Sequence, residues 1–390
     1  MKFKFCALSA SLVFLGLLNS HAQTNGGTTT DGRNGNTITT AVPFLLITPD
    51  ARAGAAGDAG VATSPDVNAT YWNPAKLAFL KSQYGFSLSY SPWLQKLVPD
   101  ISLSYINGFY RLDDRNVIGG SLRYFSLGQI QLVDANQTNL GTYSPNELSV
   151  DGSFARSFGE NFSLGTALRF IYSNLSSGVI DGSQNKPGTA VAADISAFYQ
   201  EDKDFFGSPA TLAFGLDISN IGTKMSYSDG SPKYFIPTNM RLGGASTFHL
   251  DGFNDFTIAL DLNKLLVPTP PIYDNKGRII AGKDPNRSVP AGIFGSFSDA
   301  PGGFSEEIQE VSISTGLEYW YNNLFAVRTG YFYENPNKGN RQYLTLGLGL
   351  KYNIVNIDLS YLLANQQKSP LANTLRFSLV FNFNSQVKTN

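Results

Sequence analysis

Twelve charged side chains are the residues best placed to carry chemistry, because one recurs in each apolar-alternating segment after residue 117. They are Arg123, Asp151, Arg169, Asp194, Asp217, Arg241, Asp261, Glu318, Arg328, Lys351, Asp358 and Arg376. Six are basic and six are acidic. Paired carboxylates could act as an aspartyl protease, but acids interspersed with bases favour ion pairs. A selective ion pore would concentrate one sign of charge. The balanced set therefore predicts a paired network.

Other catalytic residue types are scarce. His249 is the only histidine after residue 22, and Cys6 is the only cysteine. Without a second histidine or cysteine, the common zinc sites and Cys–His pairs are unavailable. A Ser–His–acid triad built on His249 stays open, although no nucleophile motif supports it. Gly347 and Gly349 lie in a leucine-rich strand pattern, where glycine is usually a packing device. We therefore expect no enzyme activity, no metal and no cofactor.

The first 22 residues have the order of a secretory signal peptide. Lys2 and Lys4 precede an apolar run, Phe5–Leu18, and small residues follow at Ser20 and Ala22. The apolar run is too short to span a membrane. Cys6 lies inside it, so cleavage would leave no cysteine and no disulfide.

The composition of the exported chain favours membrane strands. Aromatic residues make up 13% and charged residues 15%, with 38 glycines. No run of 18 apolar residues follows the signal, which excludes apolar spanning helices. Without Lys2 and Lys4 there remain 27 basic and 30 acidic residues, a net charge of −3. That charge is too small to predict nucleic acid as a partner.

From Tyr84 the hydrophobic period is two. Fourteen runs of about ten residues alternate in this way, from Tyr84–Tyr90 to Leu375–Phe383. They predict an all-β membrane protein, a 14-stranded antiparallel transmembrane β-barrel over residues 84–384 with a short tail at 385–390. The polar face should point into the lumen, where the twelve charges would pair and hold a plug. Ordinary lumen polarity also explains most individual charges. The apolar face should contact membrane lipid.

Loop lengths support the barrel. Short turns are expected at 159–161, 322–323 and 353, and long loops at 127–146, 173–189, 220–237 and 265–310. Short periplasmic turns and long extracellular loops are typical of outer-membrane barrels. A soluble β-sandwich would alternate in hydrophobicity but would not produce this asymmetry.

An N-terminal hatch (plug) with helical and coil structure is expected before the barrel. Residues 23–40 are rich in glycine, threonine and asparagine and should be flexible. Residues 41–83 should form the hatch at the periplasmic end. Asp50 could cap a segment from Ala51 to Ala59, and Asn73 followed by Pro74 is a good start for a helix through Leu80.

Three segments carry a resemblance to a known family. They are AVPFLLITPDARAGAAGDAGVA at 41–62, NATYWNPAKLA at 68–78 and LNKLLVPTPP at 262–271. The chain resembles the PorV (LptO) family of the type IX secretion system along its whole mature length. The Asn-Pro-Ala element alone is similar to the hatch of the broader FadL-like outer-membrane barrels. On this resemblance, the hatch residues are Asp50, Arg52, Gly54, Gly57, Asp58, Asn73 and Pro74.

The resemblance implies a shuttle in the cell outer membrane. Such barrels bind the C-terminal signal domains of secreted cargo as they leave the type IX translocon. They carry the cargo to a cell-surface attachment complex that contains the sortase-like protease PorU. A FadL-like transporter of hydrophobic small molecules is the main alternative, and an outer-membrane hydrolase is a second.

The long loop at 265–310 is the expected docking element. Pro268, Pro270 and Pro271 favour a stiff, extended start, and Ile272 and Tyr273 would offer apolar anchors. Apolar side chains on a preordered loop favour protein docking. Alternatively, the loop folds inward and covers its own barrel.

Overall fold

A computed structural model describes residues 35–93, 100–133, 139–175, 179–180, 183–184, 186–205, 207–228, 232–364 and 374–383. The predicted signal peptide and the predicted tail at 385–390 lie outside these residues. Nowhere in these ranges is a helix long and apolar enough to cross a membrane.

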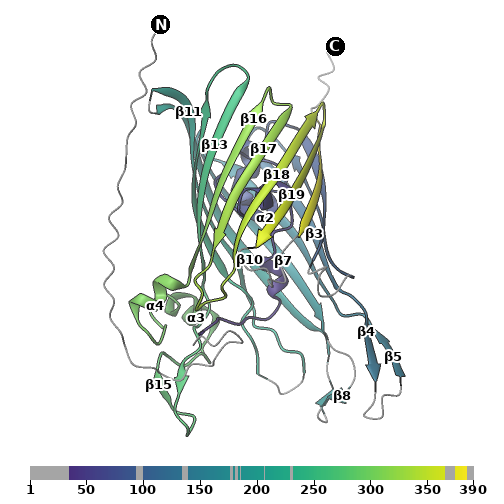
Figure 1. The fold of residues 1–390 in the computed structure, drawn as a ribbon, viewed down its shortest axis with the longest axis vertical. Helices are drawn as coiled ribbons and strands as arrows, with labels where there is room; N and C mark the ends of the chain where they lie inside the picture. Colours follow the sequence, from purple (N-terminus) through teal and green to yellow (C-terminus); the bar gives the residue numbers. More distant parts are fainter. Residues whose placement is uncertain are drawn as a thin grey trace.

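Fourteen antiparallel strands close into one barrel, as predicted (Figure 1). They are β1 (Tyr84–Pro92), β2 (Ile101–Arg111), β3 (Asn116–Leu127), β6 (Asn146–Ser157), β7 (Phe162–Asn174), β10 (Gly188–Phe205), β11 (Ser208–Gly222), β12 (Asn239–His249), β13 (Asn254–Leu265), β16 (Val311–Tyr321), β17 (Phe325–Tyr333), β18 (Gln342–Tyr352), β19 (Val355–Ala364) and β20 (Leu375–Phe383). Pairing of β1 with β20 closes the sheet, so the barrel has no free edge.

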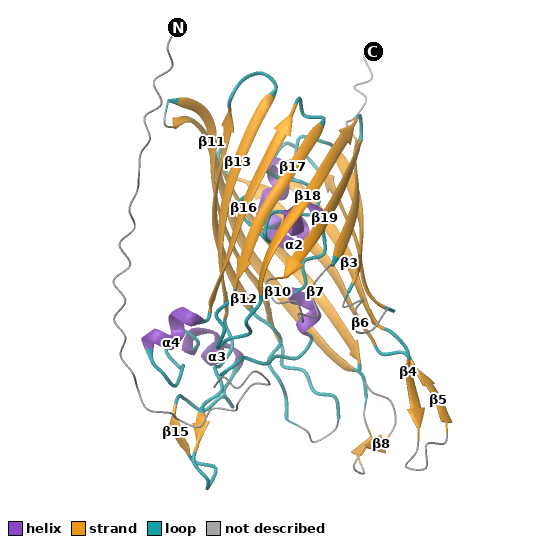
Figure 2. Cartoon of the chain, in the orientation of Figure 1, coloured by secondary structure: helices purple, strands orange, loops and turns teal. Residues whose placement is uncertain are grey.

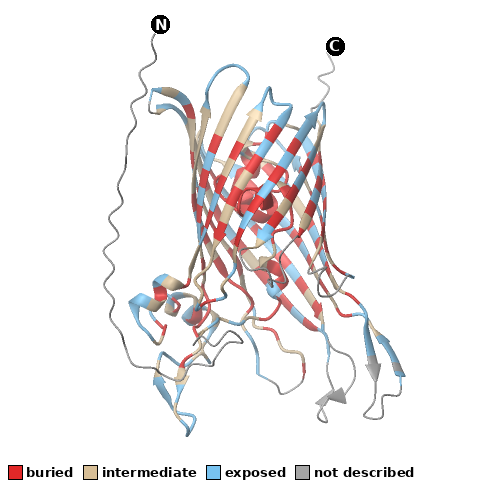
Figure 3. Ribbon diagram, in the orientation of Figure 1, coloured by how far each residue is buried: buried red, intermediate tan, exposed pale blue. Residues whose placement is uncertain are grey.

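The period-two pattern sorts side chains between lipid and lumen (Figure 3). In β18, Leu344, Leu346 and Leu348 are exposed on the outer face, whereas Tyr343 and Thr345 are buried inside. The outward leucines can face lipid tails while the backbone bonds are satisfied between strands.

Short and long connections segregate to opposite ends of the barrel (Figure 2). At the short-turn end, Asn322 and Asn353 adopt positive φ angles of 53° and 52°, which asparagine tolerates in tight turns. At the long-loop end, the connections carry small elements of their own. These are the hairpins β4–β5 (Ile130–Val133 and Asn139–Tyr143), β8–β9 (Val179–Ile180 and Ser183–Gln184) and β14–β15 (Ile272–Tyr273 and Ile279–Ala281), and the helices α3 (Val289–Gly295) and α4 (Phe304–Gln309).

Four short helices form the plug inside the barrel (Figure 1). They are η1 (Pro43–Leu46), α1 (Ala51–Ala55), α2 (Ala69–Trp72) and η2 (Pro74–Phe79). Asp50 caps α1 by accepting a hydrogen bond of 2.9 Å from the backbone N–H of Ala53. The helix ends four residues before the predicted Ala59, because Gly57 and Asp58 turn the chain with positive φ angles of 67° and 61°.

The plug runs through the whole lumen, and its N-terminal part lies at the long-loop end. There the backbone N–H of Asn36 donates to the Asn337 carbonyl at 3.0 Å, and that of Ala41 donates to the Phe235 carbonyl at 2.9 Å. At the opposite end, the N–H of Gln83 donates to the Phe383 carbonyl at 2.9 Å. The expected placement of the hatch at the periplasmic end alone is therefore wrong.

An apolar cluster explains this path. Phe44 and Leu45 of the plug pack with apolar residues of strand ends and loops at the long-loop end. These partners include Ile101, Leu103, Phe125, Ile171, Met225 and Ile236. Burial of this surface holds residues 41–47 near the outer mouth. The described part of the segment expected to be flexible, 35–40, is tied to the loops through Asn36.

This path predicts that Thr37 is reachable from outside the cell. In a Thr37→Cys variant, the exposed position should react with a membrane-impermeant maleimide on intact cells. Asn275→Cys in the long loop is the positive control, and Asn353→Cys at a short turn should react only after permeabilisation. Cys6 lies in the predicted signal peptide and should not interfere. Labelling of Thr37→Cys only after permeabilisation would contradict the path.

Candidate functional site

Eleven of the twelve charges predicted to face the lumen are buried there, and one is not. The buried ones are Arg123, Asp151, Arg169, Asp194, Asp217, Arg241, Asp261, Glu318, Arg328, Asp358 and Arg376. Lys351 lies on the inward side of the register but is exposed where β18 reaches a short turn. It therefore does not belong to the buried network, because the strand leaves the packed part of the lumen before this residue.

One ladder of charges joins the plug to three strands. Arg52 of α1 binds Asp66 of the plug at 2.8 Å and Glu318 of β16 at 2.8 Å. Glu318 also binds Arg328 of β17 at 2.5 Å, and Arg328 binds Asp358 of β19 at 2.6 Å. Each arginine bridges two carboxylates, so no member of the ladder is left as an uncompensated buried charge.

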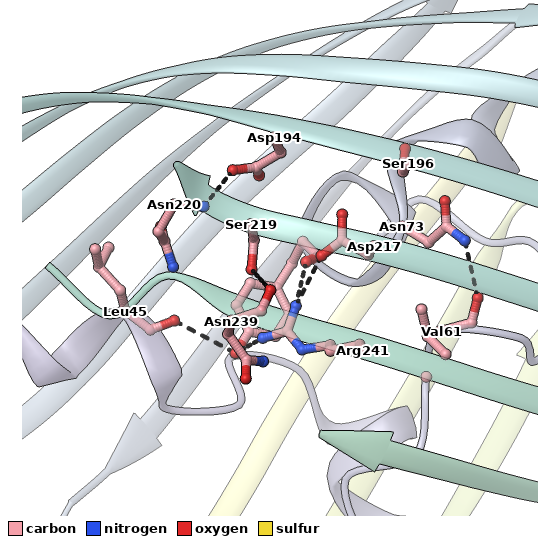
Figure 4. Close-up of polar contacts among 12 residues, drawn as sticks. Leu45, Val61, Asn73, Asp194, Ser196, Asp217, Ser219, Asn220, Asn239 and Arg241 are labelled. Atoms are coloured by element: carbon pink, nitrogen blue, oxygen red, sulfur yellow. Dashed lines mark hydrogen bonds and ion pairs between the residues drawn. The ribbon is translucent and has the colours of Figure 1, made fainter. Parts of the chain in front are cut away.

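A second group of charges joins β6, β7, β10 and β11. Arg169 binds Asp151 and, at 2.9 Å, Asp194. Asp194 also accepts a hydrogen bond of 2.8 Å from the backbone N–H of Asn220 (Figure 4). Asp151 and Asp194 therefore share an arginine and do not face each other as a protease dyad would.

Arginines also bind the plug directly. Arg241 of β12 binds Asp217 at 3.3 Å (Figure 4). It also donates to the Tyr71 carbonyl at 3.2 Å. Its guanidinium lies 4.7 Å from the centre of the Tyr71 ring, within cation–π range. From the other side, Arg123 donates to the Leu45 carbonyl at 2.8 Å and lies 4.5 Å from the same ring centre. Tyr71 is thus held between two cations.

The charges form their pairs along the wall and with the plug. Neighbouring strands lie roughly 4.8 Å apart, within reach of one side chain. The plug occupies the centre and supplies partners of its own. Asp261, for example, accepts hydrogen bonds from the plug N–H groups of Gly60 and Val61 at 2.7 and 2.9 Å.

Two plug glycines lie in close contact with the barrel. A Cβ on Gly54 would lie 2.6 Å from Nη1 of Arg376. At Gly57 the φ angle is 67°, and a Cβ would lie 2.5 Å from the backbone nitrogen of Tyr331. A side chain at Gly57 would therefore meet both a strained backbone and an immovable neighbour. The adjacent Asp58 accepts a hydrogen bond from the Tyr343 hydroxyl at 2.5 Å.

Asn73 and Pro74 begin η2 and tie it to the wall. The Asn73 carboxamide oxygen accepts from the N–H of Ala75 at 3.1 Å, which is the expected cap. Its nitrogen donates to the carbonyls of Val61 and Ala197 at 3.1 and 3.0 Å (Figure 4). Pro74 fills the first helical position, where its missing N–H costs nothing. One side chain therefore organises the plug and its contact with β10.

The predicted docking stretch is mostly unavailable. Pro268 and Pro271 are buried, Pro270 and Ile272 are half-buried, and only Tyr273 is exposed. This stretch is therefore largely enclosed rather than exposed for docking. The cause is the apolar run preceding it, since Leu266 and Val267 are buried at the rim.

The exposed apolar surface of the long loop lies further along the chain. Phe294 of α3 and Phe304 of α4 are each 79% exposed. The other large apolar side chains that the same loop exposes are Tyr273, Ile279, Ile280, Phe297 and Ile308. We call these seven residues the loop surface. Solvent-exposed aromatic side chains on helices are typical of protein-docking sites.

Two lysines anchor the loop surface to the barrel rim. Lys264, at the end of β13, binds Glu307 at 3.0 Å and Glu310 at 2.6 Å. Lys338, in the β17–β18 loop, binds Glu310 at 3.0 Å and Glu306 at 2.5 Å. Sequence reasoning missed this cluster and also the wall contact of Arg52. The only hint of this lysine–glutamate cluster in the sequence is the run of glutamates in and after α4, at Glu306, Glu307 and Glu310.

Two acidic groups of this loop, Glu306 and Asp299, have shifted pKa values. Burial alone would raise the pKa of Glu306, but hydrogen bonds from Lys338 and the Gly302 N–H bring it below its ordinary value. Burial raises the pKa of Asp299, and its contacts with Thr269 and Arg287 only partly oppose this. The stability that ionised Glu306 gives to the folded loop is fully present above the ordinary carboxyl pKa. It is lost as the pH falls through the lowered pKa of Glu306.

His249 belongs to a hydrogen-bonded chain at the short-turn end. Its Nδ1 lies 2.7 Å from Asp255, and its Nε2 lies 3.1 Å from the Thr211 hydroxyl. That hydroxyl donates to Asp202 at 2.5 Å. Because its proton points to Asp202, the hydroxyl is not poised to pass it to the histidine. Within the described ranges, no three His, Cys, Asp or Glu residues form a metal-binding group.

The structure defines a closed 14-stranded β-barrel with a plug in its lumen. The crystal structure of the P. putida toluene transporter TodX matches 86% of this chain and 99% of its own, with a TM-score of 0.51 at 13% identity. The R. pickettii toluene transporter TbuX scores 0.48 at 12% identity over 87% of this chain and 100% of its own. A P. aeruginosa FadL homologue scores 0.45 at 10% identity over 90% and 100%. At these identities only the fold is shared.

Sequence comparison gives the family. The family model described as "Type IX secretion system protein PorV" matches residues 30–272, which is more than half of the chain. The chain belongs to the PorV family, is associated with type IX secretion and resides in the outer membrane. No curated protein matches it.

The Asn73 contacts predict a specific effect on the plug. Asn73→Ala should destabilise it by roughly 1–3 kcal/mol, through loss of the cap and of two buried hydrogen bonds. Limited proteolysis should cleave residues 41–83 faster, while heat-modifiability on gels reports an intact barrel. Asn275→Ala is the control. Altered partner binding with an unchanged proteolysis rate would show that Asn73 contacts a partner instead.

The ion pairs between the plug and the wall also predict that the intact barrel conducts ions poorly. The plug fills the lumen and is bound to the wall by the pair of Arg52 with Glu318 of β16 and by the contacts of Arg241 of β12 with Tyr71. Planar-bilayer recordings of the purified chain should show no large steady currents, and a variant lacking residues 41–80 should show them if it inserts. Large steady currents from the intact chain would contradict a seated plug.

Proposed function

We propose that this barrel is a docking shuttle of the type IX secretion system. It binds the C-terminal signal domains of secreted cargo at the translocon and delivers the cargo to the attachment complex that contains the PorU protease. It does so without catalysis of its own. The observation that carries this proposal is the anchored loop surface, presented by a barrel whose lumen is filled.

The contrast between the buried plug and the exposed loop surface supports docking. The plug makes buried ion pairs and hydrogen bonds around the wall, which suits a rigid platform rather than a route for cargo. The loop surface exposes Phe294 on α3 and Phe304 on α4, and Lys264 and Lys338 hold α4 in place. A preordered surface loses little conformational entropy on binding. Membership of the PorV family, which associates the chain with type IX secretion, supports the choice of these partners.

Transport of small hydrophobic molecules is the second candidate, because TodX, named as a toluene transporter, shares the fold. A transporter needs a continuous apolar route. Buried arginines and carboxylates line this lumen, and Arg52, Tyr71 and Asp261 fill its centre with polar contacts. Shared fold does not determine function. The filled lumen favours docking.

The loop surface provides the test. A Phe294→Ser/Phe304→Ser double variant should still fold, since both side chains are solvent-exposed. It should lose at least ~10-fold of its copurification with translocon, PorU or cargo, because exposed aromatic anchors often contribute 2 kcal/mol or more each. Phe253→Ser, an exposed aromatic at the short-turn end, is the matched control.

The result would distinguish the two candidate functions. Tagged protein would be purified in mild detergent, and partners and bound small molecules would be identified by mass spectrometry. Loss of partners only in the double variant supports docking at the loop surface. Wild-type partner levels in both variants, with hydrocarbon or lipid bound stoichiometrically, would favour the transporter.

A further inference from the structure

The hairpin of β10 and β11 extends past its neighbour β7 at the short-turn end. Pairing of β10 with β7 stops at Tyr199, and one further bond joins the N–H of Gln200 to the Asn161 carbonyl at 2.8 Å. Pairing of β10 with β11 continues to Phe205. Residues 201–205 of β10 therefore form a sheet edge beyond the end of β7. Figure 1 shows this hairpin curving away from the barrel, beside the β11 label.

The backbone of this edge is directed away from β11 at Asp202 and Asp204. Backbone N–H groups alternate between the two sides of a strand, so these residues share the direction of Gln200. Asp204 lies opposite Pro209 of β11, which has no N–H and therefore suits a pair that exchanges no backbone bonds. Among the described residues, none accepts a hydrogen bond from the N–H of Asp202 or Asp204 on this side. The edge thus offers donors and acceptors to an added strand.

The opposite edge of the hairpin is closed. β11 pairs with β12 as far as Ala210, which lies opposite Phe248. The next residue towards the turn, Pro209, has no donor to offer. Proline is a common means of keeping other strands off a sheet edge. The hairpin is therefore open to strand addition along β10.

The open edge carries uncompensated negative charge on its inner face. Side chains of β10 alternate between the faces, so Asp202 and Asp204 share the face of the inward-pointing Phe198. Within the described ranges, no cation pairs with either carboxylate. On the outer face, Glu201 is neutralised by Lys203 at 2.8 Å. The charge that an added strand would meet is therefore negative.

This charge selects among the possible occupants of the edge. A second copy of this chain would bring the same two carboxylates, and anionic lipid headgroups would also be repelled. A peptide strand with basic side chains would satisfy both the backbone groups and the charge. The carboxylates would exclude acidic strands and so make the edge specific.

We propose that residues 201–205 of β10 bind an extended, basic segment of a periplasmic protein as an added β-strand. The short turns of an outer-membrane barrel face the periplasm, where such a segment would approach. A five-residue edge offers few backbone bonds, so the contact is weak and reversible. The edge and the loop surface lie at opposite ends of the barrel, so this inference stands or fails separately from the proposed function.

A fluorescently labelled peptide of seven alternating lysine and threonine residues is the probe. Its binding to the full-length protein in nonionic detergent would be followed by fluorescence anisotropy at low salt, where exposed charges are least screened. One control peptide has glutamate in place of lysine. The other keeps lysine but is N-methylated at two adjacent central residues, which removes a donor from each side of the strand.

The lysine peptide should bind at least ~10-fold more tightly than either control, because the first control is repelled and the second lacks backbone donors. Its binding should also slow amide hydrogen exchange at residues 200–205, measured by mass spectrometry, because their N–H groups become bonded.

Two substitutions at Asp204 separate the edge from its charge. Asp204→Asn and Asp204→Pro remove the same charge, but only proline removes the N–H that faces the edge. The barrel loses no bond, because that N–H has no partner in the hairpin. Asp204→Asn should weaken binding of the lysine peptide roughly 2–5-fold, as for one exposed ion pair. Asp204→Pro should weaken it ~10-fold or more beyond Asp204→Asn, and heat-modifiability would verify folding.

Three results would overturn the proposal. Equal binding of the lysine peptide and its N-methylated form would mean that charge alone is recognised. Equal binding by Asp204→Pro and Asp204→Asn would mean that the edge is not used. Should Asp204→Pro fail to fold, hydrogen exchange of the wild-type protein decides the matter, and protection that falls elsewhere than on residues 200–205 would refute strand addition at this edge.

Discussion

The structure depends on one electrostatic constraint: charged side chains that point into a narrow barrel must find partners without bulk water. Isolated buried charges cost several kcal/mol each, and breaking a buried pair costs roughly 3–5 kcal/mol. Here the wall supplies Glu318, Asp261 and Arg241, and the plug supplies Arg52, backbone N–H groups and Tyr71. Neither part is satisfied alone. The plug therefore belongs to the folded core of the barrel rather than being a removable stopper.

That mutual dependence links the lumen to the outer loops. The plug segment that binds Arg123 and Arg241 also extends to the outer mouth. There the Asn36 side-chain nitrogen donates to the Pro270 carbonyl and to Glu306 at 3.0 Å each. Glu306 also binds Lys338, one of the two lysines that hold the loop surface. The plug, the rim and the loop helices thus form one connected polar framework. A docking surface built on it can stay ordered although it projects from the barrel.

The strands could be read from the sequence because their signal is local. Each strand alternates every second residue, as in Leu344–Leu350, and the pattern needs no knowledge of distant contacts. The caps at Asp50 and Asn73 were predictable for the same reason, since an N-cap bonds within three residues. Lys351 fits the same alternation, but alternation alone does not say where the packed lumen ends.

The parts that sequence reasoning missed depend on long-range contacts. Arg52 finds Glu318, 266 positions away, and the direction of the plug follows from an apolar cluster assembled by several strands and loops. The prolines after Val267 were expected to project outward, because proline favours extended chain. Their place was decided instead by burial of Leu266 and by the bond between Thr269 and Glu310 at 2.7 Å.

The same constraint explains how one fold can serve different functions. We propose that in this chain the inward charges, which are matched by the plug, make the barrel a platform rather than a conduit. Inward positions can carry such charges because strand pairing rests on backbone bonds and on the outward apolar face. Arg169, Arg241 and Arg328 lie at such inward positions. Their guanidinium groups fill space that a channel would need, and at the same time they brace the wall and plug that carry the outer loops.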